Sequence, residues 1–355
     1  MKFRSLFSLL VVFLMTMLVA CSSVDSGKSS GDSEKSGSEK ETAKGIDGTV
    51  TAVVQWAAGG AADTVSRAIA PLAEKELGQS IVVTNKPGAT GAIALQYVLD
   101  QKSDGRTILF AAENPALYGV LDISHKGFED LYPINIFSGA MSALIVPKDS
   151  KYETAADLID DAKANPGKIQ MGSTGPGGQP FVVSTMLSEV TGAEFNLVPY
   201  DGDGPLVTAV LGKHLDASAV GLTAALESAK AGEIKILALI HNEPLDVDGL
   251  GSIEPITETI PKMDKFLPWG PFYGAWVKND TQDNIKEELI EAFSNAQQEK
   301  DFLDFVKRTN GVSLNLSGDD AVKFWKEWQS KTTWLLHDAG VTKTSPEEFN
   351  IERIK

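Results

Sequence analysis

The sequence predicts an α/β protein with two lobes, each built on a mostly parallel sheet flanked by helices. Two observations lead to this fold class. The chain has 355 residues, more than one hydrophobic core usually supports, so two lobes are expected. From about residue 49 onward, short apolar strands alternate with helices across glycine turns. This alternation is typical of parallel sheets with crossover helices.

The first 20 residues are predicted to be a lipoprotein signal peptide. Lys2 and Arg4 precede an apolar stretch at 6–20, which is too short to span a bilayer comfortably. The residues Leu-Val-Ala directly before Cys21 resemble a bacterial lipobox, so Cys21, the single cysteine of the chain, is expected to be lipidated. An uncleaved signal anchor is the alternative. From the lipobox-like residues we expect an extracytoplasmic protein, either lipid-anchored to the outer face of the bacterial cell membrane or a periplasmic lipoprotein.

Residues 21–46 are expected to form the lipidated start and a flexible, serine-rich tether. From Ser22 to Lys40, eight of nineteen residues are serine and one is aliphatic. Such a segment cannot bury enough apolar surface to offset its chain entropy. The tether would let a folded body turn towards a partner in the same membrane.

The first lobe is expected to comprise residues 47–145 and 270–355. A β-prone run at 49–55 leads through a glycine turn into an amphipathic helix that ends at Leu77, and Gly78 is placed to cap it. Further strands are expected at 81–84, 107–112 and 271–277, and further helices at 92–100, about 282–298 and about 319–337.

The last of these helices has two features of its own. Ser317 and Asp320 have capping-box spacing at its start. Its apolar residues are interpreted as core packing, with a stripe that docks a partner as the alternative. These residues are Val322, Trp325, Trp328 and Leu335.

The second lobe is expected to comprise residues 146–269. Thr154 and Asp157 have capping-box spacing at the start of its first helix. Pro205 is expected at the first position of a later helix. Strands are predicted at 169–172, 195–199, 217–220 and 234–240, and a further helix at 180–190. Residues 241–268, rich in Pro, Gly and acidic residues, are predicted to form a long loop.

Composition excludes several classes of function. A net charge of −16 and a pI of about 4.7 argue against a nucleic-acid partner, because phosphate binding needs clustered Lys and Arg. The four histidines stand too far apart for a metal-binding pair, and no cofactor motif is present, so neither metal nor cofactor is expected. Ser173 and Ser184 have no histidine at a suggestive position. We therefore do not expect an enzyme.

Four glycine turns are the candidate ligand-binding elements. They lie at 56–63, 85–91, 173–178 and 200–204, each directly before a helix. Such turns offer unpaired backbone N–H groups and the positive end of a helix dipole, which favour an anion. Simple helix capping is the alternative for each turn. For Asp63, an N-cap and a ligand contact are equally good interpretations.

The ordered motifs of the chain resemble the substrate-binding proteins of tripartite tricarboxylate transporters, the Bug-type extracytoplasmic solute receptors. The similarity extends over roughly residues 48–345. It is carried by the segments 54–63 with Arg67, 85–91, 104–109, 162–168, 172–175, 198–200 and 202–205.

The resemblance implies a fold, a class of solute and a membrane partner. The fold would be a two-lobed clamshell like that of periplasmic binding proteins, with lobe crossings near 142–147 and 270–277. The protein would be a monomer that closes over a small organic acid: a di- or tricarboxylate, an aromatic acid or an amino acid. It would deliver this solute to large and small membrane permease subunits, without ATP. The alternatives are a binding lipoprotein of an ABC transporter and a ligand sensor for a membrane kinase.

The resemblance also implies which residues contact the solute. They come from the first and third glycine turns, from the turn after the strand at 107–112, and from the turn near residue 200. The expected substrate-binding residues are Trp56, Ala57, Ala58, Gly59, Gly60, Asp63, Glu113, Asn114, Ser173, Thr174, Gly175, Tyr200 and Gly202.

The sequence departs from the family at three acidic positions. Glu113 stands where relatives usually carry a small neutral or hydroxyl residue, and Asp201 and Asp203 flank Gly202. Three carboxylates around an anion site weaken a tricarboxylate assignment. We hypothesise that Glu113 or Asp63 meets an ammonium or hydroxyl group of the solute. The alternative is that Glu113 faces solvent.

Overall fold

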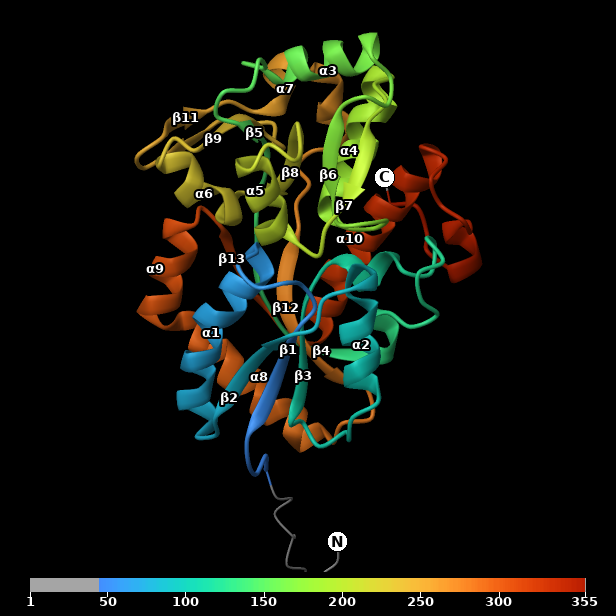
Figure 1. Cartoon of the computed structure of the whole chain (residues 1–355). Coiled ribbons are helices and arrows are strands. Elements are labelled where there is room, and N and C mark those ends of the chain that lie inside the picture. The colour runs from blue at the N-terminus through green and yellow to red at the C-terminus, as the bar shows by residue number, and fades with distance from the viewer. Residues whose placement is uncertain (1–44, 355) are drawn as a thin grey trace, which may run out of the picture. The chain divides into compact units, whose positions relative to one another are not determined.

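Two mixed β-sheets flanked by helices form the α/β clamshell that the sequence predicts (Figure 1). The computed structural model describes residues 45–354. The predicted signal peptide, the lipidation site Cys21 and the predicted tether up to residue 44 lie outside these residues. We call the part built on the six-stranded sheet lobe 1 and the part built on the five-stranded sheet lobe 2.

The sheet of lobe 1 has the strand order β13-β4-β12-β3-β1-β2. β1 pairs in parallel with β2 and β3, whereas β12 and β4 bring antiparallel pairing. The strands are β1 (Val50–Val54), β2 (Ile81–Asn85), β3 (Thr107–Ala112), β4 (Leu131–Gly139), β12 (Phe272–Lys278) and β13 (Val312–Leu316).

Alternate residues of β1 face the two helical layers of lobe 1, as the two-residue repeat of a strand requires. Val50, Ala52 and Val54 belong to the core that packs on one face of the sheet, and Val53 belongs to the core on the other. The first face carries α1 (Ala61–Leu77), α8 (Asp283–Gln298) and α9 (Lys300–Arg308). The second carries α2 (Ala92–Leu99) and α10 (Gly318–Asp338).

The sheet of lobe 2 has the order β7-β6-β8-β5-β9. Its strands are β5 (Ser142–Pro147), β6 (Gln170–Ser173), β7 (Asn196–Pro199), β8 (Ala217–Gly221) and β9 (Ile234–Leu239). One face is covered by α3 (Ala155–Ala164) and α4 (Gln179–Thr191), and the other by α5 (Asp203–Leu211) and α6 (Leu222–Lys230).

Each sheet is mixed, whereas mostly parallel sheets were expected. The parallel pairs are those of the predicted strand–turn–helix units, β1 with β2 and β3, and β6 with β7 and β8. The antiparallel strands β12 and β5 lie directly after the two crossings of the chain between lobes, so they enter their sheets from the opposite end. Because β5 begins at Ser142, residues 142–145 lie in the sheet of lobe 2.

The predicted helix caps agree with the structure in most places. Gly78 caps α1 with φ 63°, and Thr154 and Asp157 form a capping box at the start of α3. Two predictions were wrong. The side chain of Ser317 makes no cap hydrogen bond at the start of α10, and α5 begins at Asp203, two residues before Pro205.

The segment predicted as a long loop, 241–268, contains short elements. They are β10 (Leu245–Val247), β11 (Gly251–Ile253), the helical turn α7 (Ile256–Thr259) and a 3-10 helix at Pro261–Phe266. Each has between three and six residues, which is too short for a hydrophobic pattern to repeat often enough to be recognised, so the sequence gives little signal for it.

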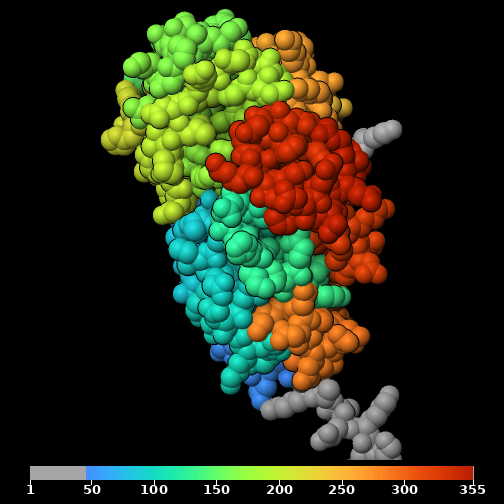
Figure 2. Space-filling view, turned by 90° about the vertical axis from the view of Figure 1, so that its right-hand side faces the viewer, coloured from blue at the N-terminus to red at the C-terminus, as the bar shows by residue number. Residues whose placement is uncertain are grey.

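Helix α10 packs against both lobes. Trp325 belongs to a core of lobe 1, where its ring lies 5.6 Å from that of Phe128, and Leu336 belongs to a core of lobe 2. Figure 2 shows the red C-terminal segment lying against both the yellow-green and the cyan parts of the molecule. The predicted core role of Trp325 is therefore confirmed. No helix among residues 45–354 is long and apolar enough to cross a membrane.

Candidate functional site

A small cavity of about 30 Å³ lies between the two lobes. It is found at the carboxyl ends of β1, β3, β6 and β7, where the glycine turns lead into helices. Its volume accommodates about one or two water molecules. The cavity is lined by Trp56, Gly60, Ala61, Ala62, Ala112, Glu113, Asn114, Thr174, Gln179, Pro180, Gly202, Asp203, Pro271 and Tyr273.

Direct hydrogen bonds between the lobes surround this cavity. The backbone N–H of Ala57 donates to the carbonyl oxygen of Asp201 over 2.9 Å. The side-chain amide of Asn114 donates to the carbonyl oxygen of Gly177 over 2.6 Å. Since neither bond can form when the lobes are apart, the structure shows a closed clamshell.

The two glycine turns at the centre of the cleft approach each other closely through their backbones. A Cβ atom on Gly204 would lie 2.8 Å from the carbonyl oxygen of Ala58 and 3.0 Å from the carbonyl carbon of Gly59. No side chain fits there, because real Cβ atoms do not approach backbone atoms so closely. Glycine at position 204 is therefore needed for this degree of closure.

Glu113 is buried in the wall of the cavity, directly after β3. Its side chain is 1% exposed, and its Oε2 atom has no hydrogen-bond partner. Burial raises the pKa of the Glu113 carboxyl to about 8. The charge of Asp203 adds to this increase, and the backbone N–H groups of Glu113 and Phe272 oppose it. The alternative that Glu113 faces solvent was wrong.

Asp203 is a second carboxyl group at the cavity, contributed by the other lobe. It is the first residue of α5, and its Oδ2 accepts a hydrogen bond of 3.2 Å from the backbone N–H of Gly221. Burial raises the pKa of Asp203 to about 6, while hydrogen bonds from the backbone of Gly221 and of Ala61 act in the opposite direction. Ala61 is the first residue of α1, so this carboxyl lies at the N-terminus of a helix of lobe 1.

Tyr273 lies beside these two carboxyl groups. A Cβ atom on Gly221 would meet the Asp203 Oδ2 at 3.1 Å and the Tyr273 hydroxyl at 3.3 Å, so both groups converge on one point. Burial raises the pKa of Tyr273 well above its usual value, and the charges of Asp203 and Glu113 raise it further. The phenol therefore remains neutral and can donate or accept a hydrogen bond.

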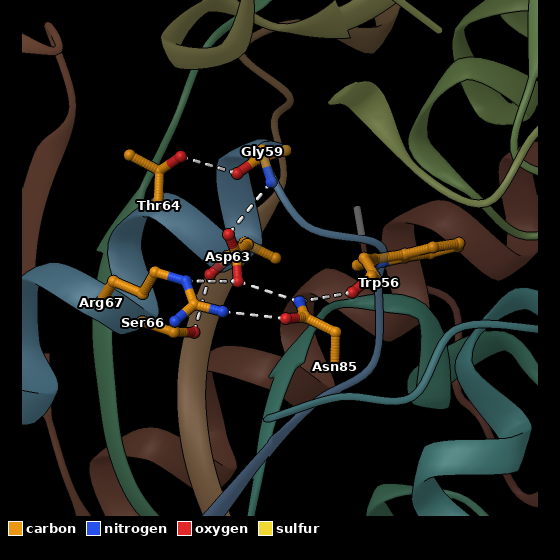
Figure 3. A network of polar contacts seen from close by, with 9 residues as sticks. Trp56, Gly59, Asp63, Thr64, Ser66, Arg67 and Asn85 are labelled. Carbon is orange, nitrogen blue, oxygen red and sulfur yellow. Dashed lines mark hydrogen bonds and ion pairs between the residues drawn. The ribbon is translucent and has the colours of Figure 1, made fainter. Parts of the chain in front are cut away.

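Asp63 organises the first glycine turn (Figure 3). It is not among the residues that line the cavity. Its Oδ2 accepts from the backbone N–H of Gly59 over 3.0 Å, and its Oδ1 accepts from Arg67 and Asn85 over 2.9 Å each. Burial alone would raise the pKa of Asp63, but these hydrogen bonds outweigh it and lower the pKa. The N-cap of α1 is Gly60, so the N-cap interpretation of Asp63 was wrong.

The structure brings six of the expected binding residues together around the cavity. They are Trp56, Gly60, Glu113, Asn114, Thr174 and Gly202. Ala58, Gly59 and Tyr200 line a wider neighbouring cleft of about 760 Å³ beside α5. Ala57 contributes a backbone bond between the lobes, and Ser173 accepts a hydrogen bond from the N–H of Gly175 over 3.2 Å.

Several cavity residues were not among the expected contacts. Asp203 was noted in the sequence as a departure from the family, and Gln179 directly follows the glycine turn at 173–178. Pro271 and Tyr273 come from the crossing into β12, whose position beside the other turns depends on the tertiary fold. Among the described residues, no group of three His, Cys, Asp or Glu side chains could hold a metal ion.

Comparison with known proteins places the chain among solute receptors. A family model described as "Tripartite tricarboxylate transporter family receptor" matches residues 65–341. A UPF0065 protein of the TAR-I ttuE-ttuC′ intergenic region of Agrobacterium vitis is 29% identical over 249 residues, 70% of each chain.

Two solved structures share the fold. The periplasmic binding protein BugD superposes with a TM-score of 0.77 at 24% identity, over 84% of this chain and 99% of BugD. MatC from Rhodopseudomonas palustris with bound malate superposes with a TM-score of 0.74 at 20% identity, over 82% of this chain and 99% of MatC.

Proposed function

Because the chain belongs to the tripartite tricarboxylate transporter receptor family, we propose that it is an extracytoplasmic receptor that closes its lobes over a small carboxylate-containing solute. The observation that carries the proposal is the closed cavity, whose walls come from both lobes. A solute trapped there would be held by the same interdomain contacts that close the cleft. MatC, which has the same fold, was solved with bound malate.

The structure supplies donors suited to a carboxylate at the start of α4. The backbone N–H groups of a helix N-terminus are unpaired and carry partial positive charge. Gln179, the first residue of α4, lines the cavity, and its Nε2 atom has no hydrogen-bond partner. A solute carboxylate placed here would receive both kinds of hydrogen bond.

We further propose that the receptor is a monomeric lipoprotein anchored through Cys21 and that it delivers its solute to a tripartite permease. The lipobox-like residues before Cys21 and the serine-rich segment after it support the anchor. Metabolic labelling with a fatty-acid analogue, with Cys21→Ser as control, tests the anchor. Co-purification of the large and small permease subunits with the liganded receptor tests the partner.

Thermal unfolding tests the central proposal. A solute that binds only the folded receptor should stabilise it by about 3 kcal/mol at a hundredfold excess over the dissociation constant. Purified protein, unfolded and refolded to remove any co-purified solute, would be screened against di- and tricarboxylates, aromatic acids and amino acids. If no solute in this panel raises the melting temperature, the proposal fails.

A further inference from the structure

The cavity between the lobes carries acidic groups from both sides and no basic group. Glu113 comes from lobe 1 and Asp203 from lobe 2, and none of the lining residues is Lys, Arg or His. A di- or tricarboxylate would therefore add negative charge next to two carboxyl groups. Like charges at such short range are unfavourable in a buried site.

Glu113 is positioned to accept a hydrogen bond that the protein does not supply. Its Oε2 is buried and unpartnered although the side chain is 1% exposed. Buried polar atoms in native proteins are nearly always paired, so an unpaired acceptor in a cavity wall marks a place for a donor from a solute. The charge of Glu113 also acts on the Tyr273 hydroxyl of β12, which stays neutral because burial raises its pKa well above the usual value.

Asp203 occupies the position at which an anionic solute would otherwise meet α1. Its carboxyl group accepts a hydrogen bond from the backbone of Ala61, the first residue of α1, and another from the N–H of Gly221. The positive end of the α1 dipole is thus already neutralised by a carboxyl group of the chain itself. In this closed form, the first glycine turn does not present a free anion site.

Gln179 places a neutral hydrogen-bond donor in the same cavity as the two carboxyl groups. Its side chain is 6% exposed, and its Nε2 is an unpartnered donor at the start of α4. Thr174, also in the cavity wall, has an unpartnered hydroxyl oxygen. The cavity therefore combines a free acceptor on the acidic side chain of Glu113 with unpartnered polar groups on the neutral side chains of Gln179 and Thr174.

We propose, on the basis of the receptor function proposed above, that the solute carries a protonated amine held by Glu113 and Asp203 and an acidic or amide group that accepts from Gln179. The solute class is an amino acid or a related zwitterion, and simple di- and tricarboxylates are excluded. Such a solute is larger than the cavity of about 30 Å³, so the lobes separate to admit it, and the side chains that line the cavity shift to make room when the lobes close over it.

The binding of an ammonium group to Glu113 should release a proton. Burial raises the pKa of Glu113 to about 8, so at neutral pH the carboxyl is mainly protonated before the amine arrives. The titratable groups that act on Glu113 or respond to it are Asp203, Tyr118 and Tyr273. Both tyrosines are neutral in this range. Affinity for an amine-bearing solute should therefore rise by up to tenfold for each pH unit between 6 and 8.

The test uses pairs of solutes that differ only in an amino group. Aspartate is compared with succinate, glutamate with glutarate, and 4-aminobutyrate with butyrate, by calorimetry on the full chain at pH 6, 7 and 8. Glu113→Gln and Asp203→Asn remove the two carboxylates with little change in shape. Asp160→Asn, an exposed carboxylate on α3, is the matched control.

The outcomes separate the two proposals. We expect the amine-bearing member of at least one pair to bind, to bind more tightly at higher pH, and to lose tenfold or more of its affinity in Glu113→Gln but not in Asp160→Asn. If amine-free acids bind as well or better, or if Glu113→Gln and Asp203→Asn leave the affinity for the amine-bearing solute unchanged, the inference about the amine is overturned while the receptor function stands. If no amine-bearing member binds while an amine-free acid of the thermal-unfolding panel does, the inference about the amine is overturned and the receptor function stands. If no solute of either set binds, both proposals fail.

Discussion

Asn114 of lobe 1 donates a hydrogen bond from its side-chain amide to the carbonyl oxygen of Gly177 in lobe 2 over 2.6 Å. The Asn114 side chain is held in place because its Oδ1 accepts from the Nε2 of Gln55 over 2.8 Å. Both side chains are fully buried. One amide thus links the floor of lobe 1 to a glycine turn of lobe 2, and it does so only when the cleft is closed.

Asn114→Ala should weaken solute binding without unfolding lobe 1. The substitution removes a buried bond that exists only in the closed form, which is worth about 1 kcal/mol, or roughly a fivefold loss of affinity. Calorimetry with any solute found in the screen measures the change. Asn295→Ala is the control, because the Asn295 amide is exposed and bonds to Glu76 within lobe 1. Equal losses in both variants would contradict this role.

Gly204→Ala should prevent full closure. The added Cβ would lie 2.8 Å from the carbonyl oxygen of Ala58, yet alanine suits the α5 helix better than glycine does. We therefore expect an unchanged or slightly raised melting temperature without solute, and an affinity at least tenfold lower. Small-angle scattering should show a more open particle with solute present. A variant that binds normally would show that the two turns separate in the solute complex.

Asp63→Ala should lower the stability of the protein by about 2–3 kcal/mol, because it removes a buried carboxylate that accepts from Gly59, Arg67 and Asn85. Urea unfolding measures this free energy. Asp104→Ala is the control, since Asp104 pairs with Arg106 at the surface and such pairs contribute little. A loss of affinity in Asp63→Ala without a loss of stability would instead indicate a direct contact with the solute.

Raising the pH from 5 to 8 should destabilise the protein through Glu113 and Asp203. Their pKa values are raised to about 8 and about 6 in the folded chain, so the folded form binds more protons than the unfolded form in this range. Stability is then greatest below the unfolded pKa values and falls as the pH rises through the folded ones. The slope from Glu113 approaches about 1 kcal/mol per pH unit.

Urea unfolding at several pH values measures this slope. Glu113→Gln should flatten it between pH 6 and 8, whereas Asp203→Asn should flatten it mainly below pH 6. Carboxyl groups with lowered pKa values, such as Asp161 at about 2 and Asp63, change their contribution at lower pH and do not mask the effect. A stability that is constant from pH 5 to 8 would contradict the burial of both acids.

Local sequence signals were sufficient for the strand–turn–helix units. The unit from β1 to Gly78 could be predicted because a β-prone run, a glycine turn and a helix cap follow one another within 30 residues. The direction of β5 and β12 could not, since strand pairing across a lobe crossing depends on residues far apart in the chain. For the same reason, Tyr273 could not be assigned to the cavity from its neighbours in sequence.

The glycine turns that form the candidate site could be predicted from the sequence. The burial and the hydrogen-bond partners of its acidic residues could not. Glu113 could be selected by its position after β3 and its departure from the family, but whether it was buried or exposed depended on the packing of the other lobe. Asp63 and Asp203 are both acids near a glycine turn. Only the structure distinguishes them, because Asp63 is satisfied within its own turn and Asp203 reaches the start of α1 in the opposite lobe.

Helix α10 carries a tryptophan whose fluorescence should report on the angle between the lobes. Trp328 on this helix donates from its indole N–H to the carbonyl oxygen of Gly270 over 2.9 Å, and its ring lies 5.8 Å from that of Trp269 in the crossing segment. Since α10 packs on both lobes, a change in the angle between them alters the surroundings of this indole pair. Opening and closing can therefore be followed in real time by intrinsic fluorescence, with no label attached to the cleft.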